Sequence, residues 1–519
     1  MDGQIKPTEI TIVNSDEKTP IVYGEALDLY ANREKSVASV AAVDDPLVSI
    51  YFQAYNHLED YTKPAIAALL RYTAEIDYEL ILVDNGSTDG TFEFFKTVEH
   101  PRKRIYRITK NIGAFYAYRA AKYATCGRFL RGKYYLGLPN DILVTKNWLR
   151  NMLICMESDE HIGFVVPMSD NVSNLQEVDL GYSDFEDMQE KAAAFNVSDP
   201  RKWHDRVRLI PTVCMIRTAL REFYEADYAF IYEFSDDDIS FAYRRLGYRN
   251  VLCGDVFVHH EGSTMSAAVP EQRAENIEKG RALFRCKYNG IDAWSDVVNF
   301  EVYLRRALFE HAEMRENASV LGIDVRCGTP IMEIRNTLRE NGLREALLTA
   351  YTTDPKYWQD LSCFCEGGVF CGDIDRLSHK LGDAMFDYII IGEYGDLYED
   401  ALAVIRSAAS HLRAGGALVC KLRNYDLPYE LEAVANALQT PPAPLAQGMQ
   451  RLEAELRNLP YHINIYPYME DAYEVRESFF AQLRTMEEYQ NNTHVREVFS
   501  EEHFDALMTQ YAVVLRKRV

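Results

Sequence analysis

The chain has 519 residues, of which 47% are hydrophobic and 26% are charged, so it has enough apolar chain for a globular protein of two or three domains. Its formal net charge of -23 at pH 7 argues against nucleic acid as a partner, because a polyanion would be repelled. The sequence shows neither a run of ~20 apolar residues that could span a membrane nor the pattern of a signal peptide, so we expect a cytoplasmic protein.

The first 45 residues are a polar lead-in, with one short helix expected around Glu25–Ser39. From residue 46 to about 290, apolar β-like runs alternate with helical patterns such as Thr62–Ala74 and Ala114–Ala124. This alternation predicts an α/β domain with a mainly parallel, helix-covered sheet. The expected strands are Val48–Phe52, Leu80–Val83, Arg104–Ile108, Tyr134–Leu138, Gly163–Val166 and Val251–Val258.

Two of the expected strands end in acidic and small residues. The strand Leu80–Val83 runs into Asp84-Asn85-Gly86-Ser87, a stretch of turn formers, and Tyr134–Leu138 runs into Pro139-Asn140-Asp141. Ligands of open α/β sheets bind beyond the carboxyl ends of the strands. Asp84 and Asp141 are therefore placed for binding.

Five segments follow one another along this domain. They are VSIYFQAYN from Val48, VDNGSTDGT from Val83, NIGAFYAYRAA from Asn111, the PND tripeptide from Pro139, and EFSDDDISFAYRRLGYRNVLCGDVFVHHEGS from Glu233. Together they resemble the nucleotide-sugar-binding GT-A domain of the inverting family 2 glycosyltransferases. The chain departs from that family at Gln53-Ala54, where Pro-Thr is usual, and in the PND tripeptide, where only the last position is acidic.

The resemblance implies a set of donor-binding residues. It places Tyr55 near the nucleotide base, Asp84 on the base or ribose, and Asn111 and Gly113 beside the ribose and phosphates, with Asn140 in the same nucleotide-sugar site. The segment 169–208, which contains a helical patch at Phe185–Ala194, would contribute to acceptor binding in this family. A solvated surface insertion explains that polar segment equally well.

Sugar transfer from a nucleotide diphosphate calls for a divalent cation on the leaving diphosphate and a base for the acceptor hydroxyl. Mg²⁺ and Mn²⁺ bind carboxylate oxygen, and Mn²⁺ also accepts imidazole. By resemblance, Asp141 contacts the cation and His259 is the second candidate ligand. His260 is its rival, because neighbouring side chains on a strand point to opposite faces.

The segment Ser235-Asp236-Asp237-Asp238 opens a predicted helix that ends near Gly247. Acidic residues also stabilise the first turn of a helix, which accounts for at least one of the three aspartates. By spacing from Gly247-Tyr248, Asp236 falls on the family's catalytic aspartate, with Asp237 as the alternative base. Asp238 is expected to hold the helix N-terminus or the loop, and Ser235 replaces the glutamate that usually precedes the base.

Two further helices are expected between Pro270 and Glu316, and from Ala318 a second α/β pattern begins and ends in a strand at Tyr511–Leu515. Within it, a Pro-containing loop is expected at 439–447 and a helix at 450–457. This half is similar to the class I S-adenosylmethionine-dependent methyltransferases. However, Arg326 and Pro330 stand where that family has glycines, and they would crowd the cofactor. We therefore expect a degenerate domain that does not bind S-adenosylmethionine and serves packing, homodimerisation or acceptor binding.

The predicted order is an extension at 1–45, a GT-A domain at 46–290, a helical linker at 291–316 and a methyltransferase-like Rossmann domain at 317–519. We expect a metal-dependent, inverting glycosyltransferase that moves a sugar from a nucleotide-diphosphate donor to a hydroxyl of a glycan or protein acceptor. Two alternatives stay open: a bifunctional glycosyltransferase and methyltransferase, and a non-catalytic carbohydrate-binding or scaffold protein. The donor sugar and its base, UDP, GDP or dTDP, are not readable from side-chain identity.

Overall fold

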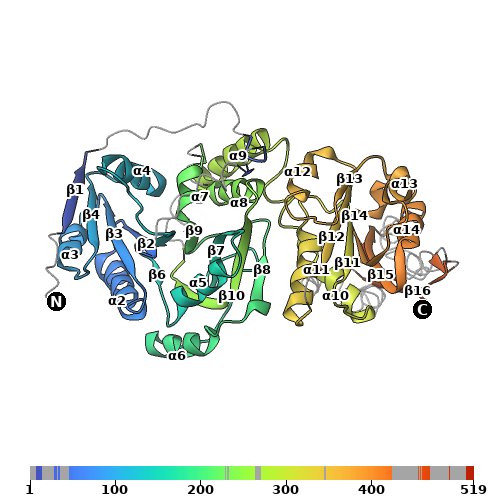
Figure 1. Ribbon diagram of the computed structural model, residues 1–519, viewed down its shortest axis with the longest axis horizontal. Coiled ribbons are helices and arrows are strands. Elements are labelled where there is room, and N and C mark those ends of the chain that lie inside the picture. Colours follow the sequence, from blue (N-terminus) through green and yellow to red (C-terminus); the bar gives the residue numbers. More distant parts are fainter. Residues whose placement is uncertain are drawn as a thin grey trace. The chain divides into compact units, whose positions relative to one another are not determined.

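The computed structural model divides into two compact units, Met1–Val298 and Asn299–Val519 (Figure 1). The division falls within the segment predicted as a linker. Of the helix predicted at 25–39, only 28–31 and 33–34 are described; the loop predicted at 439–447 and most of the helix at 450–457 lie outside the described residues. The structure describes residues 8–14, 28–31, 33–34, 46–227, 229–230, 233–262, 270–343, 346–423, 454, 456–457, 459–467, 490 and 510–518.

In the described part of the first unit, one sheet of ten strands has the order β1-β4-β3-β2-β5-β9-β7-β10-β6, with β8 also paired to β10 (Figure 1). All six predicted strands are present. The four others were not predicted, because they are short and depend on partners far away in the sequence. The strands are β1 Glu9–Val13, β2 Val48–Ala54, β3 Tyr78–Asn85, β4 Lys103–Ile108, β5 Tyr134–Pro139, β6 Ile142–Leu143, β7 Ile162–Ser169, β8 Trp203–Asp205, β9 Cys214–Arg217 and β10 Arg249–His260.

Strand direction decides which loops gather at one edge of this sheet. Strands β2, β3, β4 and β5 run parallel to one another. Strand β9 is antiparallel to both β5 and β7, so β7 runs in the direction of β5, and β10 is parallel to β7. The carboxyl ends of these six strands therefore share one edge, which is where ligands of α/β sheets bind.

Helices cover both faces of the sheet. Helices α2, α3 and α5 pack in one apolar core with the inner face of β2, β3 and β5. Helices α4, α7 and α8 pack on the opposite face in a second core. The helices of this unit are α2 Lys63–Tyr72, α3 Thr91–Thr97, α4 Ala114–Ala124, α5 Trp148–Glu157, α6 Phe185–Phe195, α7 Thr218–Phe223, α8 Ser235–Arg245 and α9 Pro270–Lys287, with the single turns η1 Leu58–Thr62 and η2 Pro200–Lys202.

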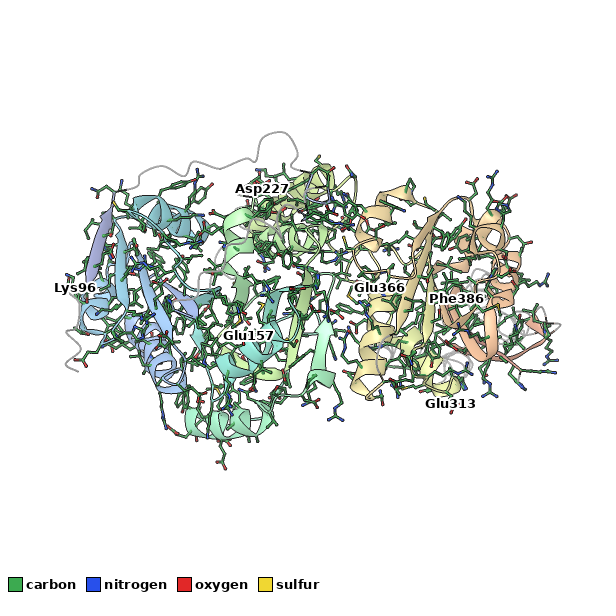
Figure 2. All side chains as sticks on the ribbon, in the orientation of Figure 1. Lys96, Glu157, Asp227, Glu313, Glu366 and Phe386 are labelled. Carbon is green, nitrogen blue, oxygen red and sulfur yellow. The ribbon has the colours of Figure 1, made fainter. Side chains whose placement is uncertain are left out.

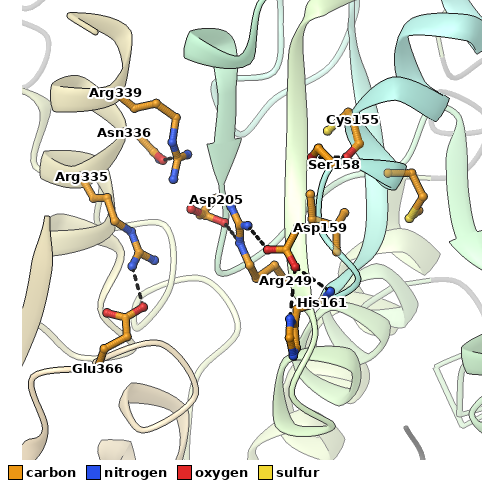
Figure 3. Close-up of polar contacts among 12 residues, drawn as sticks. Cys155, Ser158, Asp159, His161, Asp205, Arg249, Arg335, Asn336, Arg339 and Glu366 are labelled. Carbon is orange, nitrogen blue, oxygen red and sulfur yellow. Dashed lines mark hydrogen bonds and ion pairs between the residues drawn. The ribbon is translucent and has the colours of Figure 1, made fainter. Parts of the chain in front are cut away.

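The first residue of β10, Arg249, is held in place by two carboxylates. The Arg249 guanidinium donates to Asp159 Oδ2 at 2.6 Å and to Asp205 Oδ1 at 2.7 Å, and the backbone N–H of His161 donates to Asp159 at 2.9 Å (Figure 3). Asp205 is buried, so its charge needs this partner. The contacts fix where β10 starts, and with it where its carboxyl end lies.

The second unit contains a seven-stranded sheet among its described residues, in the order β13-β12-β11-β14-β15-β17-β16. All neighbours are parallel except β17, which is antiparallel to both β15 and β16. The order reverses between β11 and β14, the switch point at which doubly wound sheets bind ligands. The strands are β11 Ser319–Ile323, β12 Leu347–Thr352, β13 Val369–Cys371, β14 Phe386–Tyr394, β15 Leu412–Arg423, β16 Tyr461–Pro467 and β17 Gln510–Lys517.

This second sheet is also covered by helices, and its apolar centre is formed by β11, β14, β15 and β17 together with α14. The predicted fold class, two successive α/β domains, is confirmed. The helices and single turns are α10 Val302–His311, α11 Thr329–Glu340, η4 Pro355–Tyr357, α12 Trp358–Leu361, η5 Ile374–Arg376, α13 Leu377–Leu381, η6 Gly395–Leu397 and α14 Ala401–Ser410.

Candidate functional site

The loops that follow β2 and β3 are joined by two hydrogen bonds at the shared edge of the first sheet. The backbone N–H of Asn56 donates to Ser87 Oγ at 2.8 Å, and the N–H of Thr88 donates back to Asn56 Oδ1 at 2.9 Å. Asn56 has a φ of 54°, a left-handed conformation that asparagine tolerates better than most residues. The side chain of the preceding Tyr55 is 41% exposed, as a residue that stacks on a ligand would be.

Asp84, the strand-end aspartate of β3, is fully buried. One of its oxygens accepts the N–H of Ser87 at 3.0 Å, and the other forms an ion pair with Arg107 on β4. Arg107 also donates to the carbonyl of Ser87 at 2.8 Å. In this structure, then, Asp84 acts on the loop itself, and Arg107 is a residue at this edge that the motif comparison did not indicate.

The loop after β4 packs against the loop after β3. Asn85 Nδ2 donates to Asn111 Oδ1 at 3.0 Å, and the N–H of Gly113 donates to the same oxygen at 3.0 Å. Gly86 has a φ of 84°, and a Cβ on it would lie 2.4 Å from the backbone nitrogen of Asn111, so no larger residue fits there. Gly113, with a φ of 89°, is the N-cap of α4, whose first N–H groups point toward this edge.

Asn140 connects the loop after β5 to the loop after β2. Its Nδ2 donates to the carbonyl of Asn56 at 3.1 Å and to Thr62 Oγ1 at 3.0 Å. These bonds use both protons of the amide, so Asn140 fixes the position of Asp141 beside it.

Asp141 faces His260 across the pairing of β6 with β10. Strand β6 pairs antiparallel to the end of β10, with His260 opposite Ile142. Asp141 Oδ2 lies 3.7 Å from His260 Nε2, and Asp141 Oδ1 is buried without a hydrogen-bond partner among the described residues. His260 Nδ1 lies 3.2 Å from the carbonyl of Asn171, which can only accept, so Nδ1 carries a proton. Burial opposes protonation of the ring, but the facing Asp141 carboxylate outweighs it and raises the pKa of His260.

His259, the other candidate ligand, is turned to the opposite side of β10. Its Nδ1 lies 2.7 Å from Asp170 Oδ2 and 2.6 Å from the Tyr182 hydroxyl, and its Nε2 lies 3.3 Å from Glu261. Asp170 follows β7 directly and also accepts the backbone N–H of His260 at 2.7 Å. The structure therefore brings His260, and not His259, to Asp141.

The three aspartates at the start of α8 have three different environments. Asp238 is completely buried and holds other elements: its carboxylate accepts from the Tyr224 hydroxyl at 2.6 Å, the Tyr288 hydroxyl at 2.7 Å and Lys287 Nζ at 2.6 Å. Asp237, 2% exposed, forms an ion pair with Arg208 Nε at 2.5 Å. Both charges are thus balanced by a cation.

Asp236 differs from its two neighbours. Among the described residues it forms one hydrogen bond, from Ser235 Oγ at 3.4 Å, and no ion pair. Burial, followed by the neighbouring charge of Asp237 and partly offset by Arg208, raises the pKa of Asp236 to about 7. A carboxylate of this pKa can take a proton from a hydroxyl near neutral pH.

Asp236 also belongs to the shared edge of the sheet. Its charge contributes to the raised pKa of the Cys214 thiol, although burial is the main cause. Cys214 begins β9 and pairs with Gly137 on β5, two residues before Pro139. Helix α8 leads through Gly247 into the opposite end of β10, so its first turn returns toward the carboxyl edge. Asp236 therefore lies on the same side of the sheet as the loop of Asp141.

The side chains at Asp141 and His260 fit a divalent cation. Two ligands that each lie about 2.1 Å from one ion are at most about 4.2 Å apart, so a separation of 3.7 Å is compatible with a shared ion. The His260 Nδ1–H bond to a carbonyl is the support that metal-binding imidazoles usually have. No cluster of three or more His, Cys, Asp and Glu side chains with metal-binding geometry occurs in the described ranges, so other ligands would come from donor and water.

The corresponding edge of the second sheet is occupied by the chain's own side chains. Arg326 has a φ of 54°, the left-handed conformation that glycine adopts easily, and its guanidinium donates to both oxygens of Glu393, at 2.5 and 3.2 Å. Asp324 accepts from the N–H of Thr353 at 2.6 Å and from the Tyr398 hydroxyl at 2.7 Å. These bonds connect the ends of β11, β12 and β14 at the switch point. The polar groups of these residues are thus bonded to one another at this switch point.

Sequence reasoning missed several residues that now define the site. Asp170 had a usable signal, since it follows an expected strand as Asp84 and Asp141 do. Arg107 and Arg208 had none, because each meets its carboxylate only through the tertiary fold. Lys287 lies in a helix whose apolar pattern revealed nothing of its partner.

No helix in the described part of the chain is long and apolar enough to cross a membrane.

Comparisons with known proteins give a family match within the first unit. Residues 49–208 match the family model of Glycosyl transferase family 2. An uncharacterized glycosyltransferase of Methanocaldococcus jannaschii is 29% identical over 125 residues, which are 24% of this chain and 41% of the relative. The match thus spans less than half of that relative's length.

Two similar solved structures have low overall scores. A mannosyltransferase of Pyrobaculum calidifontis, in complex with GDP-Man and Mn²⁺, is 18% identical with a TM-score of 0.33, over 54% of this chain and 76% of that one. The plantazolicin methyltransferase BpumL, in complex with a triazolic desmethylPZN analog and SAH, is 14% identical with a TM-score of 0.27, over 48% of this chain and 99% of that one.

Proposed function

From the match of residues 49–208 to the family model of Glycosyl transferase family 2, we propose that the protein is an inverting glycosyltransferase that uses a nucleotide-diphosphate sugar. The observation that carries the proposal is the environment of Asp236. It is the one aspartate of its triplet without an ion pair among the described residues, and its pKa is raised to about 7. An aspartate that only stabilises the start of a helix requires neither a raised pKa nor the absence of an ion pair.

The reaction is a single displacement. Asp236 removes the proton of the acceptor hydroxyl while the oxygen of that hydroxyl attacks the anomeric carbon of the donor. The new carbon–oxygen bond forms while the bond from that carbon to the diphosphate breaks, so the configuration inverts and nucleoside diphosphate leaves. The proton stays on Asp236 until solvent or product removes it.

Asp141 and His260 would hold a divalent cation, with Mn²⁺ favoured by the mixed carboxylate and imidazole ligands. When bound, such a cation would neutralise negative charge on the departing diphosphate. Two contacts would hold His260 in position for the cation. Asp170 accepts the backbone N–H of His260 at the end of β10, and the carbonyl of Asn171 orients the imidazole ring.

The donor would lie over the loops after β2, β3 and β4. Tyr55 offers an exposed ring for the base, and the first turn of α4 after Gly113 offers backbone N–H groups to a phosphate. Asp84 would act on the base or ribose through the loop that it holds with Arg107. The acceptor is a hydroxyl of a glycan or protein.

The second unit has no catalytic part in this proposal. The bonds of Arg326 and Asp324 at its switch point leave it a role in packing, in a homodimer, or in holding the acceptor.

The proposal is tested with the purified 519-residue chain by thermal shift and by donor hydrolysis. UDP-, GDP- and dTDP-sugars are each incubated with and without Mn²⁺, for the wild type and for Asp236→Asn and Asp141→Ala. We expect one donor to stabilise the wild type in a metal-dependent way. Asp141→Ala should lose that stabilisation, and Asp236→Asn should keep it but lose turnover. If no donor stabilises or is hydrolysed by the wild type, the protein is a non-catalytic relative and the proposal fails.

A further inference from the structure

The residue just before the catalytic turn of α8 has a strained backbone. Phe234, the N-cap of α8, has a φ of 71° and a ψ of 5°, and its ring is buried. A bulky residue in the left-handed region is rare and energetically unfavourable unless its surroundings enforce it. Something in the fold must therefore hold Phe234 in this conformation.

The holding contacts come from the segment that follows β10. The ring of Phe234 stacks on Trp294, with centroids 5.2 Å apart and an angle of 28°. On α9, Gly280 leaves the space that the ring fills: a Cβ on Gly280 would lie 2.6 Å from Phe234 Cδ2. Phe284, one turn further along α9, packs against the same ring at 6.3 Å.

The same helix holds the residue on the other side of the catalytic turn. Lys287, the last residue of α9, places Nζ 2.6 Å from Asp238 Oδ1 and 3.0 Å from Asp227 Oδ2, and Asp227 is labelled in Figure 2. The Tyr288 hydroxyl donates to the same Asp238 oxygen at 2.7 Å. Removing the cation would leave a fully buried carboxylate poorly compensated.

We propose that the end of α9, together with Trp294, is a clamp that positions the general base, with Gly280, Phe234 and Lys287 as positioning residues for Asp236. The clamp contacts Phe234, two residues before Asp236, and Asp238, two residues after it. Asp236 itself has no ion pair among the described residues. Its carboxylate is thus located by the backbone and stays available to take a proton. The inference rests on the proposed function, since it assigns a role to residues that support its base.

The clamp is tested by changing its fit without removing the base. Gly280→Ala adds a methyl group that must displace the Phe234 ring, while alanine favours the helix itself, so the variant should fold. Lys287→Met removes the cation, and Lys287→Arg restores it. Cys286→Ala, an exposed change on the same turn of α9, is the matched control. For each variant we would measure kcat and the pH dependence of kcat/KM in the donor-hydrolysis assay, and donor affinity by calorimetry.

We expect Gly280→Ala and Lys287→Met to lose 10-fold or more in kcat, because a displacement near 1 Å at a catalytic group can cost about 100-fold. Donor affinity should stay within about twofold, and the acidic limb of the pH profile should move. Lys287→Arg should recover part of kcat, and Cys286→Ala should match the wild type.

Two failures are distinguishable. If the wild type transfers no sugar, the proposed function itself is wrong. If Asp236→Asn is inactive while Gly280→Ala and Lys287→Met keep their kcat and pH profile, the base stands and only the clamp is refuted. An equal loss of donor affinity and kcat in both variants would also refute it, because the residues would then support the whole site.

Discussion

His260 Nε2 lies 3.7 Å from Asp141 Oδ2, while the adjacent His259 is bonded to Asp170 on the other face of β10. The two histidines differ by one position in a strand, and that step decides which imidazole reaches the carboxylate. The motif alone favoured His259. The pairing of His260 with Ile142 of β6 gives the opposite preference.

The first prediction concerns this choice of ligand. Asp141→Ala and His260→Ala should each lower the affinity for Mn²⁺ at least 10-fold, measured by calorimetry in the presence of the nucleoside diphosphate. His259→Ala should bind Mn²⁺ within a few-fold of the wild type, because its partners are Asp170, Tyr182 and Glu261. Loss of binding in His259→Ala alone would reverse the assignment.

A second prediction follows from the raised pKa of Asp236. A general base must be deprotonated, and burial together with Asp237 raises the pKa of Asp236 to about 7. The logarithm of kcat/KM should therefore rise with pH up to about 7 and level off above it. Asp236→Asn should lower kcat by about 100- to 10,000-fold and abolish this limb. A profile that is flat from pH 5 to 8 would exclude Asp236 as the base.

The same pKa has an opposite consequence for stability. The carboxyl of Asp236 titrates near 3.8 when unfolded and at about 7 when folded, so between these values the folded state binds more protons and stability falls as pH rises. Above about 7 the destabilisation is complete, and each unit of pKa shift corresponds to about 1.4 kcal/mol. Asp236→Asn should thus be more stable than the wild type at pH 8.

Urea unfolding at pH 8 and pH 4 checks this sign. The advantage of Asp236→Asn should be present at pH 8 and largely gone at pH 4. Cys286→Ala, an exposed change that leaves all three carboxylates and their hydrogen-bond partners in place, is the control. An asparagine variant that is less stable than the wild type at pH 8 would show that the charge of Asp236 is stabilised in the fold.

The last prediction concerns the second unit. Arg326 and Glu393 bond to each other at the switch point, so we expect that S-adenosylmethionine does not bind the wild type in calorimetry at millimolar concentration. Glu393→Gln should lower the free energy of unfolding by about 1 kcal/mol by weakening this partly buried pair. Arg326→Gly should cost less, because glycine adopts a φ of 54° without strain. Saturable binding to the wild type would restore the bifunctional alternative.

Local patterns predicted much of the fold. The runs at Leu80–Val83 and Tyr134–Leu138 are strands because apolar residues bounded by turn formers report their own burial. The helix at Ala114–Ala124 was predicted with its observed bounds. By contrast, β6 has two residues and β8 has three, and β1 lies in a polar segment; each is a strand because β10 or β4 pairs with it.

By itself, the sequence determined which side chains stand at strand ends and helix starts, because these positions follow from periodicity and turn chemistry along the chain. Asp84, Asp141 and the aspartates of α8 were found in this way. Only the tertiary structure decided what each of them does, because charge balance depends on partners that are distant in sequence. Asp84 forms an ion pair with Arg107, Asp237 with Arg208, and Asp238 with Lys287. The pairing of β6 with β10 brings His260 to Asp141. The fold thereby left Asp236 without an ion pair among the described residues.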